Sequence, residues 1–181
     1  MNIVEPIKDK KALKKIETNL GAKRNKRDLI LFVMGTNTGL RVSDILALNV
    51  CDVKGKDFVD IIEKKTGKRK KFPLNDKIKT LIYTFTLNRE DSEPLFKTMY
   101  KNRMERTYAY RIVNKACRTI GMEDKVGTHT LRKTFGYHHY HKFRDIVLLQ
   151  KIFNHYSPSV TLRYIGIDQE EINNSYLNFV L

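Results

Sequence analysis

Apolar positions recur at the spacing of helical turns along most of the chain, and they predict a mostly helical protein. The first such stripe predicts a helix that begins at an Asp9 cap and ends at Gly21. A second helix is expected from about Asn25, and its segment Leu29–Met34 is apolar on every side. A helix of this kind belongs in the middle of a fold. The turn-forming cluster at 36–39 predicts where it ends.

Helical spacing returns later in the chain and predicts further, shorter helices. Capping residues, a glycine and a proline mark where several of them begin or end. The expected segments are Val42–Leu48, Asp76–Phe85 with Asp76 as the cap, Met104–Ile120, Thr128–His141, Arg144–Asn154, one that opens at Pro158, and a short one after Asp168.

One stretch breaks the helical period and is typical of β-structure. Phe58–Ile62 is β-branched and aromatic and predicts a strand, and Arg69–Phe72 predicts its return strand, which Pro73 ends. A turn at 66–68 joins the two into a small, strongly basic hairpin. Val50–Val53 has the composition for one further short strand. The whole pattern favours an α+β fold that is mostly helical: a single domain of packed helices with a small antiparallel β-sheet.

Composition adds charge to this picture. The 181 residues are 41% hydrophobic, which is enough for a real core, and 35 Lys and Arg against 20 Asp and Glu give a net charge of +15. Such an excess predicts a polyanionic partner, either nucleic acid or an anionic membrane surface. Insertion into a membrane is not expected, because no apolar run approaches the ~20 residues that a spanning helix needs.

Several features bear on the compartment and on metal binding. Residues 1–11 have no signal-peptide core. Cys51 and Cys117 stand among apolar residues, without a partner at metal-ligand spacing. We interpret both as reduced core residues of a cytoplasmic protein, with no disulfide between them. His138 and His141 share a helix face, but no acidic or cysteine partner accompanies them, so no metal site is expected.

Four short motifs carry candidate chemistry. Each alone is typical of an ordinary polar surface, so their order and spacing, which end in a hydroxyl nucleophile, make the case for a common site. In chain order they are Thr-Gly-Leu-Arg-Val-Ser-Asp at 38–44, Lys-Lys-Thr-Gly-Lys at 64–68, His-Thr-Leu-Arg at 129–132, and Asn154-His155 with Tyr164 nine residues after the His.

Two guanidinium groups, two imidazoles, an ammonium and a phenol fit a phosphodiester better than a neutral substrate. Arg binds phosphate oxygens through two donors and stays charged. Fixed cations stabilise the extra negative charge of a pentacovalent phosphorane. A neutral phenol is a poor nucleophile, but neighbouring cations lower its pKa and a His can take its proton. The basic leaving hydroxyl needs a general acid, which a Lys on a hairpin turn can supply.

In these motifs the chain resembles the catalytic domain of the tyrosine recombinases, or phage-type integrases, over essentially its whole length. The family's first catalytic Arg follows Thr-Gly-Leu and precedes a Ser-acidic pair, as Arg41 does. Its second motif, His-x-Leu-Arg, is matched at 129–132, and its Gly-His-Ser/Thr motif is matched by Asn-His-Tyr-Ser at 154–157. Tyr164 stands where the family's nucleophile is expected.

The resemblance implies roles for six residues in cleaving and rejoining DNA. Tyr164 would attack the phosphate and form a 3′-phosphotyrosyl link, which leaves a free 5′-hydroxyl. Because the bond energy stays in that ester, neither a metal ion nor ATP is implied. The other implied roles are phosphate clamps for Arg41 and Arg132, a hydrogen bond to the phosphate from His155, handling of the nucleophile's proton by His129, and protonation of the leaving oxygen by Lys65.

The hairpin lysine and the neighbour of the first Arg need separate mention. Lys65 precedes Thr-Gly in the hairpin turn, which is the basis for carrying the family's lysine over to it. Asp44 is expected to order the surroundings of Arg41 without touching DNA. Rival lysines in the same hairpin are Lys64, Lys68, Lys70 and Lys71.

The chain departs from the family pattern in two places. Asn154 replaces the usual Gly, and because Asn tolerates a positive φ we expect the turn to survive. The family's N-terminal core-binding domain does not fit ahead of residue 9, so residues 1–181 are interpreted as a catalytic domain without it. That interpretation covers both an expressed fragment and a natural stand-alone domain.

The expected partner is double-stranded DNA, and the expected compartment is the cytoplasm at the nucleoid. By analogy with the family we expect a monomer in solution and a homo-tetramer on paired sites. The apolar tail 172–180 either docks on a neighbouring protomer or packs on its own domain. Two other functions stay open: a DNA-binding module or competitor that does not cleave, and relaxation of DNA by type IB topoisomerase chemistry. Rival nucleophiles are Tyr137, Tyr140, Tyr156 and Tyr176.

Overall fold

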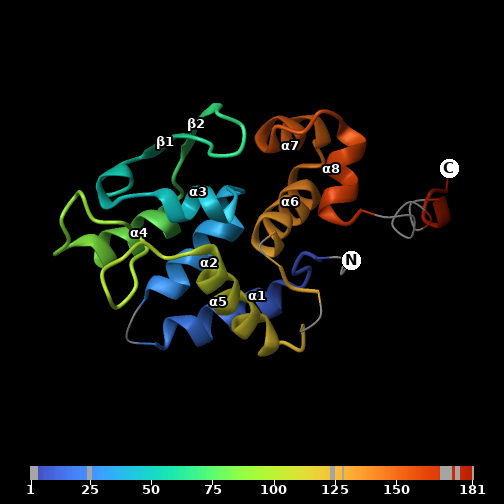
Figure 1. Ribbon diagram of the computed structural model, residues 1–181. Coiled ribbons are helices and arrows are strands. Elements are labelled where there is room, and N and C mark those ends of the chain that lie inside the picture. The colour runs from blue at the N-terminus through green and yellow to red at the C-terminus, as the bar shows by residue number, and fades with distance from the viewer. Residues whose placement is uncertain are drawn as a thin grey trace.

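The computed structural model describes residues 4–23, 26–122, 125–127, 129–167, 173 and 176–180. The described residues form a body of packed helices, with one two-stranded antiparallel sheet at its edge (Figure 1). In chain order the elements are α1 (Lys10–Gly21), α2 (Arg27–Thr38), α3 (Val42–Ala47), the 3-10 helix η1 (Val50–Asp52), β1 (Phe58–Ile62), β2 (Arg69–Pro73), α4 (Asp76–Thr86), α5 (Arg106–Arg118), α6 (Thr130–Phe143), α7 (Ile146–Phe153) and α8 (Pro158–Ile165).

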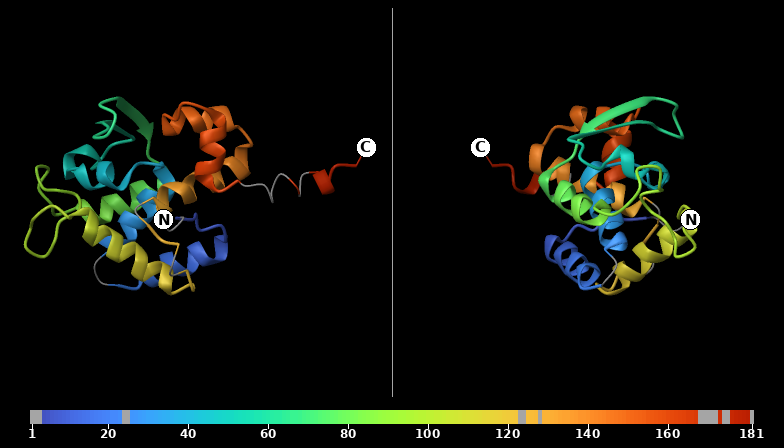
Figure 2. Two further views of the ribbon diagram at one scale, coloured as in Figure 1. Left: turned by 45° about the vertical axis from the view of Figure 1, so that its right-hand side comes forward. Right: turned by 90° about the vertical axis from the view of Figure 1, so that its left-hand side faces the viewer.

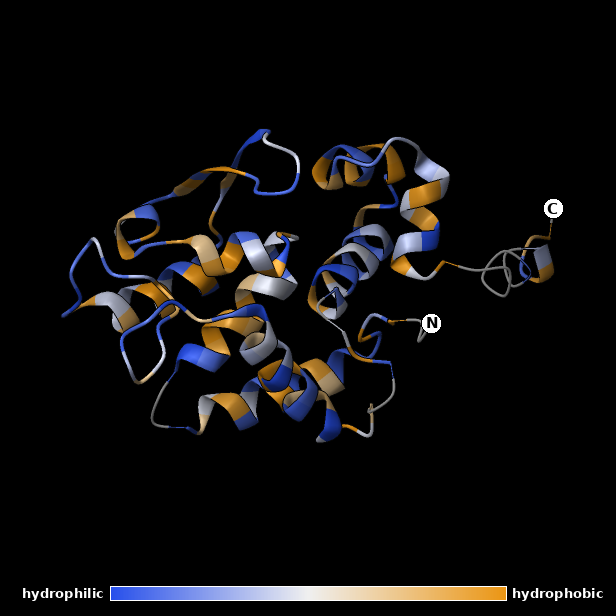
Figure 3. Cartoon of the chain, in the orientation of Figure 1, coloured by the Kyte–Doolittle hydropathy of each residue, from blue (hydrophilic) through white to orange (hydrophobic). Residues whose placement is uncertain are grey.

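Helix α2 lies at the centre of the helices, as its all-apolar segment predicts. Every residue from Leu29 to Gly35 is buried, and α2 packs against α1, α3, α4, α5 and α6. The views in Figure 2 show these helices around it, and Figure 3 shows the hydropathy of each residue along the helices. Gly39 ends α2 at a φ of 64°, within the turn cluster that the sequence indicates.

A second, smaller apolar cluster joins α6, α7 and α8. Leu149, Phe153 and Ile165 are fully buried in it, and Phe135 and Tyr164 pack against them. Helix α6 contacts both α2 and α8, so it connects this cluster to the main core. In Figure 1 the C-terminal helices α7 and α8 lie across from α3 and the hairpin, and α6 connects them to the main core.

The chain ahead of α1 is bound along α6. The Ile7 amide donates to Thr134 Oγ1 at 2.9 Å, and His138 Nε2 lies 2.9 Å from the Ile7 carbonyl oxygen. The Lys133 ammonium donates to the Val4 carbonyl at 2.7 Å. These contacts place the N-terminal residues next to the helix that connects the two apolar clusters.

The hairpin has the predicted strands and turn. Phe58 pairs with Pro73 and Ile62 with Arg69, and Val59 is buried against the main core. Pro73 is the last residue of β2 rather than the residue after it, because a strand end tolerates a residue without an amide hydrogen. The lysine-rich turn lies beside α7 (Figure 1).

The short strand expected at Val50–Val53 is wrong, because this segment contains η1. Its cap is reciprocal: Asn49 and Asp52 each bond the other's backbone, and the Asn49 amide donates to Asp52 Oδ2 at 2.7 Å. Local side-chain bonds of this kind compete with a β-ladder. Asn49 still makes one isolated bridge, to Pro94.

Several helix boundaries also differ from expectation; for example, α5 covers Arg106–Arg118 rather than Met104–Ile120. Asn75, not Asp76, caps α4, because its side chain accepts a hydrogen bond from the Ile78 amide at 3.0 Å. Arg144 adopts a φ of 54° and ends α6, so α7 starts later, at a cap on Asp145. The expected starts at Asn25 and Thr128 and the segment from Asp168 to Ile172 lie outside the described residues.

The two cysteines occupy different environments. Both are free thiols, but Cys51 is exposed and only Cys117 is buried, so interpreting both as core residues is wrong for Cys51. Cys51 lies in η1, whose capped turn leaves its side chain at the surface. Within the part of the chain that the structure describes, no helix is long and apolar enough to span a bilayer.

The apolar tail does not pack on its own domain over the residues that are described. Tyr176, Leu177, Phe179 and Val180 are between 71% and 87% exposed. Figure 2 shows this segment away from the other elements. Its apolar side chains are therefore available to another surface.

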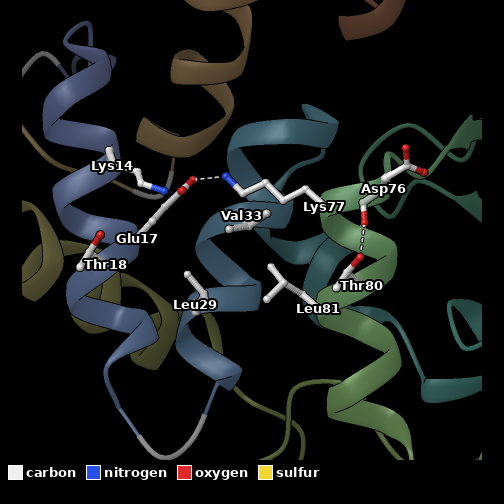
Figure 4. A pocket seen from close by; sticks show the side chains of 9 residues that line it. All are labelled: Lys14, Glu17, Thr18, Leu29, Val33, Asp76, Lys77, Thr80 and Leu81. Carbon is white, nitrogen blue, oxygen red and sulfur yellow. Dashed lines mark hydrogen bonds and ion pairs between the residues drawn. The ribbon is translucent and has the colours of Figure 1, made fainter.

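A pocket of about 470 Å³ lies between α1, α2 and α4, away from the four motifs (Figure 4). Leu29, Val33 and Leu81 form its apolar part. Lys77 reaches across it from α4 to Glu17 on α1, with a distance of 2.6 Å between nitrogen and oxygen. This ion pair connects two helices that both pack on α2.

The contact between α2 and α6 gives a prediction for stability. A Cβ on Gly35 would lie 2.4 Å from Leu131 Cδ1 and 2.7 Å from Leu131 Cβ, so the two helices would have to separate. We expect Gly35→Ala to lower the free energy of unfolding by about 1–3 kcal/mol in urea titrations. Gly21→Ala is the control, because its Cβ would meet only Leu29 Cδ2 at 3.7 Å, and it should not destabilise. Equal stability of the two variants would contradict the close approach.

Candidate active site

The turn after α2 positions Arg41. Gly39 ends α2, Leu40 is buried, and Arg41 is the N-cap of α3. A Cβ at position 39 would lie 2.6 Å from Phe135 Cδ1 and 3.1 Å from Phe153 Cε1, and its φ of 64° favours glycine as well. The glycine therefore lets the Arg41 turn approach α6 and α7 closely.

Two buried carboxylates hold the Arg41 guanidinium. Arg41 Nη1 lies 3.0 Å from Glu63 Oε1 and 4.0 Å from Asp44 Oδ2, and both carboxylate side chains are fully buried. Asp44 also accepts a hydrogen bond from the Lys64 amide at 3.0 Å. Asp44 thus orders the surroundings of Arg41, as expected, and it also binds the hairpin. Glu63 is absent from the sequence-based prediction, although an acidic residue beside a lysine-rich turn is the signal that could have found it.

Arg132 connects the other motifs. It is 3% exposed, and it donates from Nη1 to the Gly39 carbonyl at 2.6 Å and from Nη2 to the Phe153 carbonyl at 2.9 Å. Its guanidinium carbon also lies 4.4 Å from the centroid of the Phe153 ring. One side chain on α6 therefore bonds the residue two before Arg41 and the residue two before His155.

The predicted nucleophile lies against the predicted base. Helix α8 begins at Pro158 under a Ser157 cap and carries Tyr164 near its end. Its phenol oxygen is 3.1 Å from His129 Nδ1. His129 is the residue just before α6, three positions ahead of Arg132. The structure therefore brings both predicted members of the His-x-Leu-Arg motif to the nucleophile.

His155 completes this cluster. Asn154 ends α7 at a φ of 53°, so the turn survives the replacement of Gly, as expected. The His155 ring centroid lies 5.0 Å from that of Tyr164, and its Nδ1 lies 3.1 Å from Thr161 Oγ1. Thr161 is fully buried on α8, and it also donates to the Ser157 carbonyl.

The environment sets the protonation states. Burial raises the pKa of Tyr164 to about 12, although Arg132 and Arg41 oppose this shift. Burial and then Arg132 lower the pKa of His129 from its ordinary value and that of His155 to about 4. In the free protein at pH 7 the phenol is therefore protonated and both imidazoles are neutral, which suits His129 to accept a proton.

Two of the hairpin lysines, Lys65 and Lys70, differ in their exposure and in their contacts. Lys65 is exposed in the turn and makes no hydrogen bond or ion pair with any residue that the structure describes. Lys70 is partly buried, donates to the Ile152 carbonyl at 2.8 Å, and has a pKa lowered to about 8 by burial and by Arg132. The structure thus brings Arg41, Arg132, His129, His155 and Tyr164 together, while the assignment of Lys65 stays a prediction.

The rival groups have other surroundings. Tyr156 is 86% exposed and Tyr176 79% exposed, whereas the Tyr164 hydroxyl contacts a motif histidine. His138 bonds the Ile7 carbonyl. Over the described ranges, no group of three His, Cys, Asp or Glu side chains is placed to hold a metal ion.

Comparison with known proteins now identifies the family. The family model described as "Phage integrase family" matches residues 8–171. The chain belongs to this family. It is 44% identical over 180 residues to the probable integrase/recombinase YoeC of Bacillus subtilis (strain 168), covering 99% of this chain and 98% of that protein. It is 28% identical over 160 residues to tyrosine recombinase XerC of Thermodesulfovibrio yellowstonii, which covers 83% of this chain but only 53% of that recombinase.

Solved recombinase structures have the same fold. XerA recombinase superposes with a TM-score of 0.78 at 18% identity, over 98% of this integrase-family chain and 64% of that one. The catalytic domain of bacteriophage HP1 integrase gives 0.64 at 19% identity, over 97% and 95%. These comparisons confirm the predicted family, fold class and enzyme class. The chain spans about half the length of the Xer-type relatives it matches, and nearly all of the B. subtilis protein.

Lys70 gives a prediction for the pH dependence of stability. Its pKa is about 8 in the folded protein and 10.5 ordinarily, so between these values the unfolded chain binds more protons. Stability must therefore rise as the pH rises through this window. Relative to Lys70→Met, the wild type should gain about 2 kcal/mol of unfolding free energy between pH 8 and pH 10 in urea titrations. Parallel pH profiles for the two proteins would contradict a lowered pKa at Lys70.

Proposed function

We propose that this integrase-family chain cleaves and rejoins double-stranded DNA through a 3′-phosphotyrosyl intermediate formed on Tyr164. The observation that carries this proposal is the 3.1 Å contact between the Tyr164 hydroxyl and His129 Nδ1, next to a buried Arg132. A phenol with a raised pKa needs a base to become a nucleophile, and a neutral imidazole in contact with it meets that need.

The chemical step conserves bonds and protons. The Tyr164 oxygen forms a bond to phosphorus as its proton passes to His129, and the bond from phosphorus to the 5′-oxygen breaks. Lys65 gives the leaving 5′-oxygen its proton. In the reverse direction a 5′-hydroxyl attacks the phosphotyrosyl ester and gives its proton to Lys65, and Tyr164 leaves with the proton that His129 returns. One ester bond replaces another, so rejoining needs no external energy source.

Arg41, Arg132 and His155 stabilise the pentacovalent phosphorane. Arg132 keeps N–H groups beyond the two that bond carbonyls, because a guanidinium has five. For His155 to donate to the phosphate from Nε2 while neutral, its Nδ1 must carry no proton, and a hydrogen bond donated to Nδ1 favours that tautomer. Thr161 supplies it by turning its hydroxyl from the Ser157 carbonyl to His155.

Double-stranded DNA is the partner that the charge and the relatives favour. The net charge of +15 suits a polyanion. Neighbouring structures include XerH site-specific recombinase bound to its difH substrate, with a TM-score of 0.68, and a lambda integrase dimer bound to a core site, with a TM-score of 0.72. We place this reaction in the cytoplasm, where the nucleoid offers such DNA.

We propose further that residues 1–181 act as one catalytic domain. The family match over 8–171 and the connection of both apolar clusters through α6 support this. The exposed tail side chains at 176–180 support assembly, so we propose a monomer in solution and a tetramer on paired DNA sites. Gel filtration with and without paired sites tests the assembly.

Covalent trapping tests the function. The DNA is a pool of nicked duplexes in which one scissile linkage lies between randomised flanks. The nick makes the released fragment short, so the piece that carries the free 5′-hydroxyl diffuses away and cannot rejoin. We expect a protease-sensitive adduct on a denaturing gel from the wild type and none from Tyr164→Phe. Binding that falls with salt but gives no adduct would favour a DNA-binding module instead. Relaxation of supercoiled plasmid without paired sites would favour topoisomerase activity.

Thr161 offers a finer prediction. Thr161→Val removes the hydroxyl that orients His155, and we expect the cleavage rate to fall about tenfold or more. Thr161→Ser keeps the hydroxyl and should stay within a few-fold of the wild type. The measurement is the rate of adduct formation at saturating DNA. Equal rates for Val and Ser would show that the hydroxyl does not set the His155 tautomer.

A further inference from the structure

Glu63 is one of two fully buried acidic side chains beside Arg41, and it is the one that belongs to the hairpin. It follows β1 at the base of the hairpin turn and is fully buried. Its Oε1 faces Arg41 Nη1 at 3.0 Å. Its Oε2 accepts hydrogen bonds from Thr66 Oγ1 at 2.8 Å and from Asn154 Nδ2 at 3.3 Å. One carboxylate therefore touches the Arg41 turn, the hairpin turn and the turn before His155.

This carboxylate stays charged in spite of its burial. Desolvation by itself would raise the pKa of Glu63, but the Thr66 hydroxyl and Arg41 more than offset it, so the pKa lies below its ordinary value. A buried charge is costly unless it is paired and hydrogen-bonded, and removing one partner of such a pair is strongly unfavourable. The contacts of Glu63 are therefore a strong constraint on the three segments.

Asn154 gives the second observation. The left-handed backbone at this position is one that glycine adopts without strain, yet the chain carries Asn there. The Asn side chain does what glycine cannot: its amide reaches across 91 positions of sequence to Glu63. The hairpin is thereby bonded to the end of α7.

The hairpin needs such attachments. Two strands with no further partner are marginally stable by themselves, and Lys65 and its neighbours in the turn are exposed. Besides Glu63, the turn region is held by the bond from the Lys64 amide to Asp44 and by the bond from Lys70 to the Ile152 carbonyl. Of the two carboxylates that face Arg41, Glu63 is the closer one, and it lies within the hairpin itself, two positions ahead of Lys65.

We propose that Glu63 is a positioning residue that, together with Asn154, holds the hairpin so that Lys65 reaches the leaving 5′-oxygen. The proposal rests on the cleavage reaction proposed above. It assigns Glu63 no contact with DNA. The carboxylate affects the proton-transfer step by fixing the position of the hairpin that carries Lys65. It affects the phosphate only through Arg41.

Changing the leaving group distinguishes an effect on proton transfer from an effect on the phosphate through Arg41. When sulfur replaces the 5′-bridging oxygen of the scissile linkage, the departing thiolate needs no proton, so the general acid becomes dispensable. The same randomised nicked duplexes are prepared with an oxygen or a sulfur at that position, and rates of adduct formation are compared. Lys65→Ala should lose about 100-fold or more on the oxygen linkage and little on the sulfur linkage.

We expect Glu63→Ala to follow Lys65→Ala in this comparison. Its rate should fall about tenfold or more on the oxygen linkage and less than about threefold on the sulfur linkage. Asn154→Gly, which keeps the backbone geometry but loses the amide, should shift the ratio of the two rates in the same direction. Glu63→Gln keeps an acceptor for Thr66 and Asn154, so its ratio should stay near that of the wild type.

The control is a carboxylate on the same hairpin that faces solvent. Asp60 pairs with the exposed Arg69, and Asp60→Ala should leave both rates unchanged. Equal losses on the two linkages for Glu63→Ala, or no loss on either, would overturn the proposal, with circular dichroism verifying that the variant is folded. An absent adduct from the wild type itself would refute the cleavage reaction instead, so the two failures are distinguishable.

Discussion

The buried guanidinium of Arg132 is the constraint on which the rest of this site depends. A guanidinium that is only 3% exposed needs hydrogen-bond acceptors in place of water, and Arg132 has them in two backbone carbonyls that are far apart in the sequence. The Gly39 carbonyl comes from the end of the central helix, and the Phe153 carbonyl comes from the end of α7. Gly39 and Phe153 directly precede the Arg41 turn and the His155 turn. The hydrogen bonds of one guanidinium therefore align the Arg41, Arg132 and His155 motifs, the first and last of which are more than a hundred residues apart.

Much of the fold follows from local patterns in the sequence. The apolar segment at 29–34 predicts the central helix, and the β-branched run at 58–62 predicts the first strand with its observed bounds. These predictions are confirmed because the competing local signals are weak there. The predicted strand at 50–53 is wrong. There, the reciprocal cap between Asn49 and Asp52 forms bonds within one turn, and these bonds outweigh the β-propensity of two valines.

In the candidate site, too, the sequence predicts some residues and not others. Motif order indicates Arg41, His129, Arg132, His155 and Tyr164, since each stands at a distinctive spacing, and the structure brings them together. The burial of Glu63 and Lys70 could not be predicted from spacing. Glu63 lies just after β1 and Lys70 lies in β2, and each is bonded by a segment far away in the sequence: Glu63 by Arg41 and Asn154, and Lys70 by the Ile152 carbonyl. Long-range packing of this kind leaves no periodic trace in the sequence.

The neutral imidazoles have a consequence for how this protein would meet its substrate. Cationic neighbours and burial keep His129 and His155 unprotonated in the free state. A phosphodiester placed among them brings a negative charge that reverses part of this electrostatic bias and raises both pKa values. If the rise is large enough for either imidazole to become protonated, DNA binding would take up protons, and the affinity would then depend on pH as well as on salt.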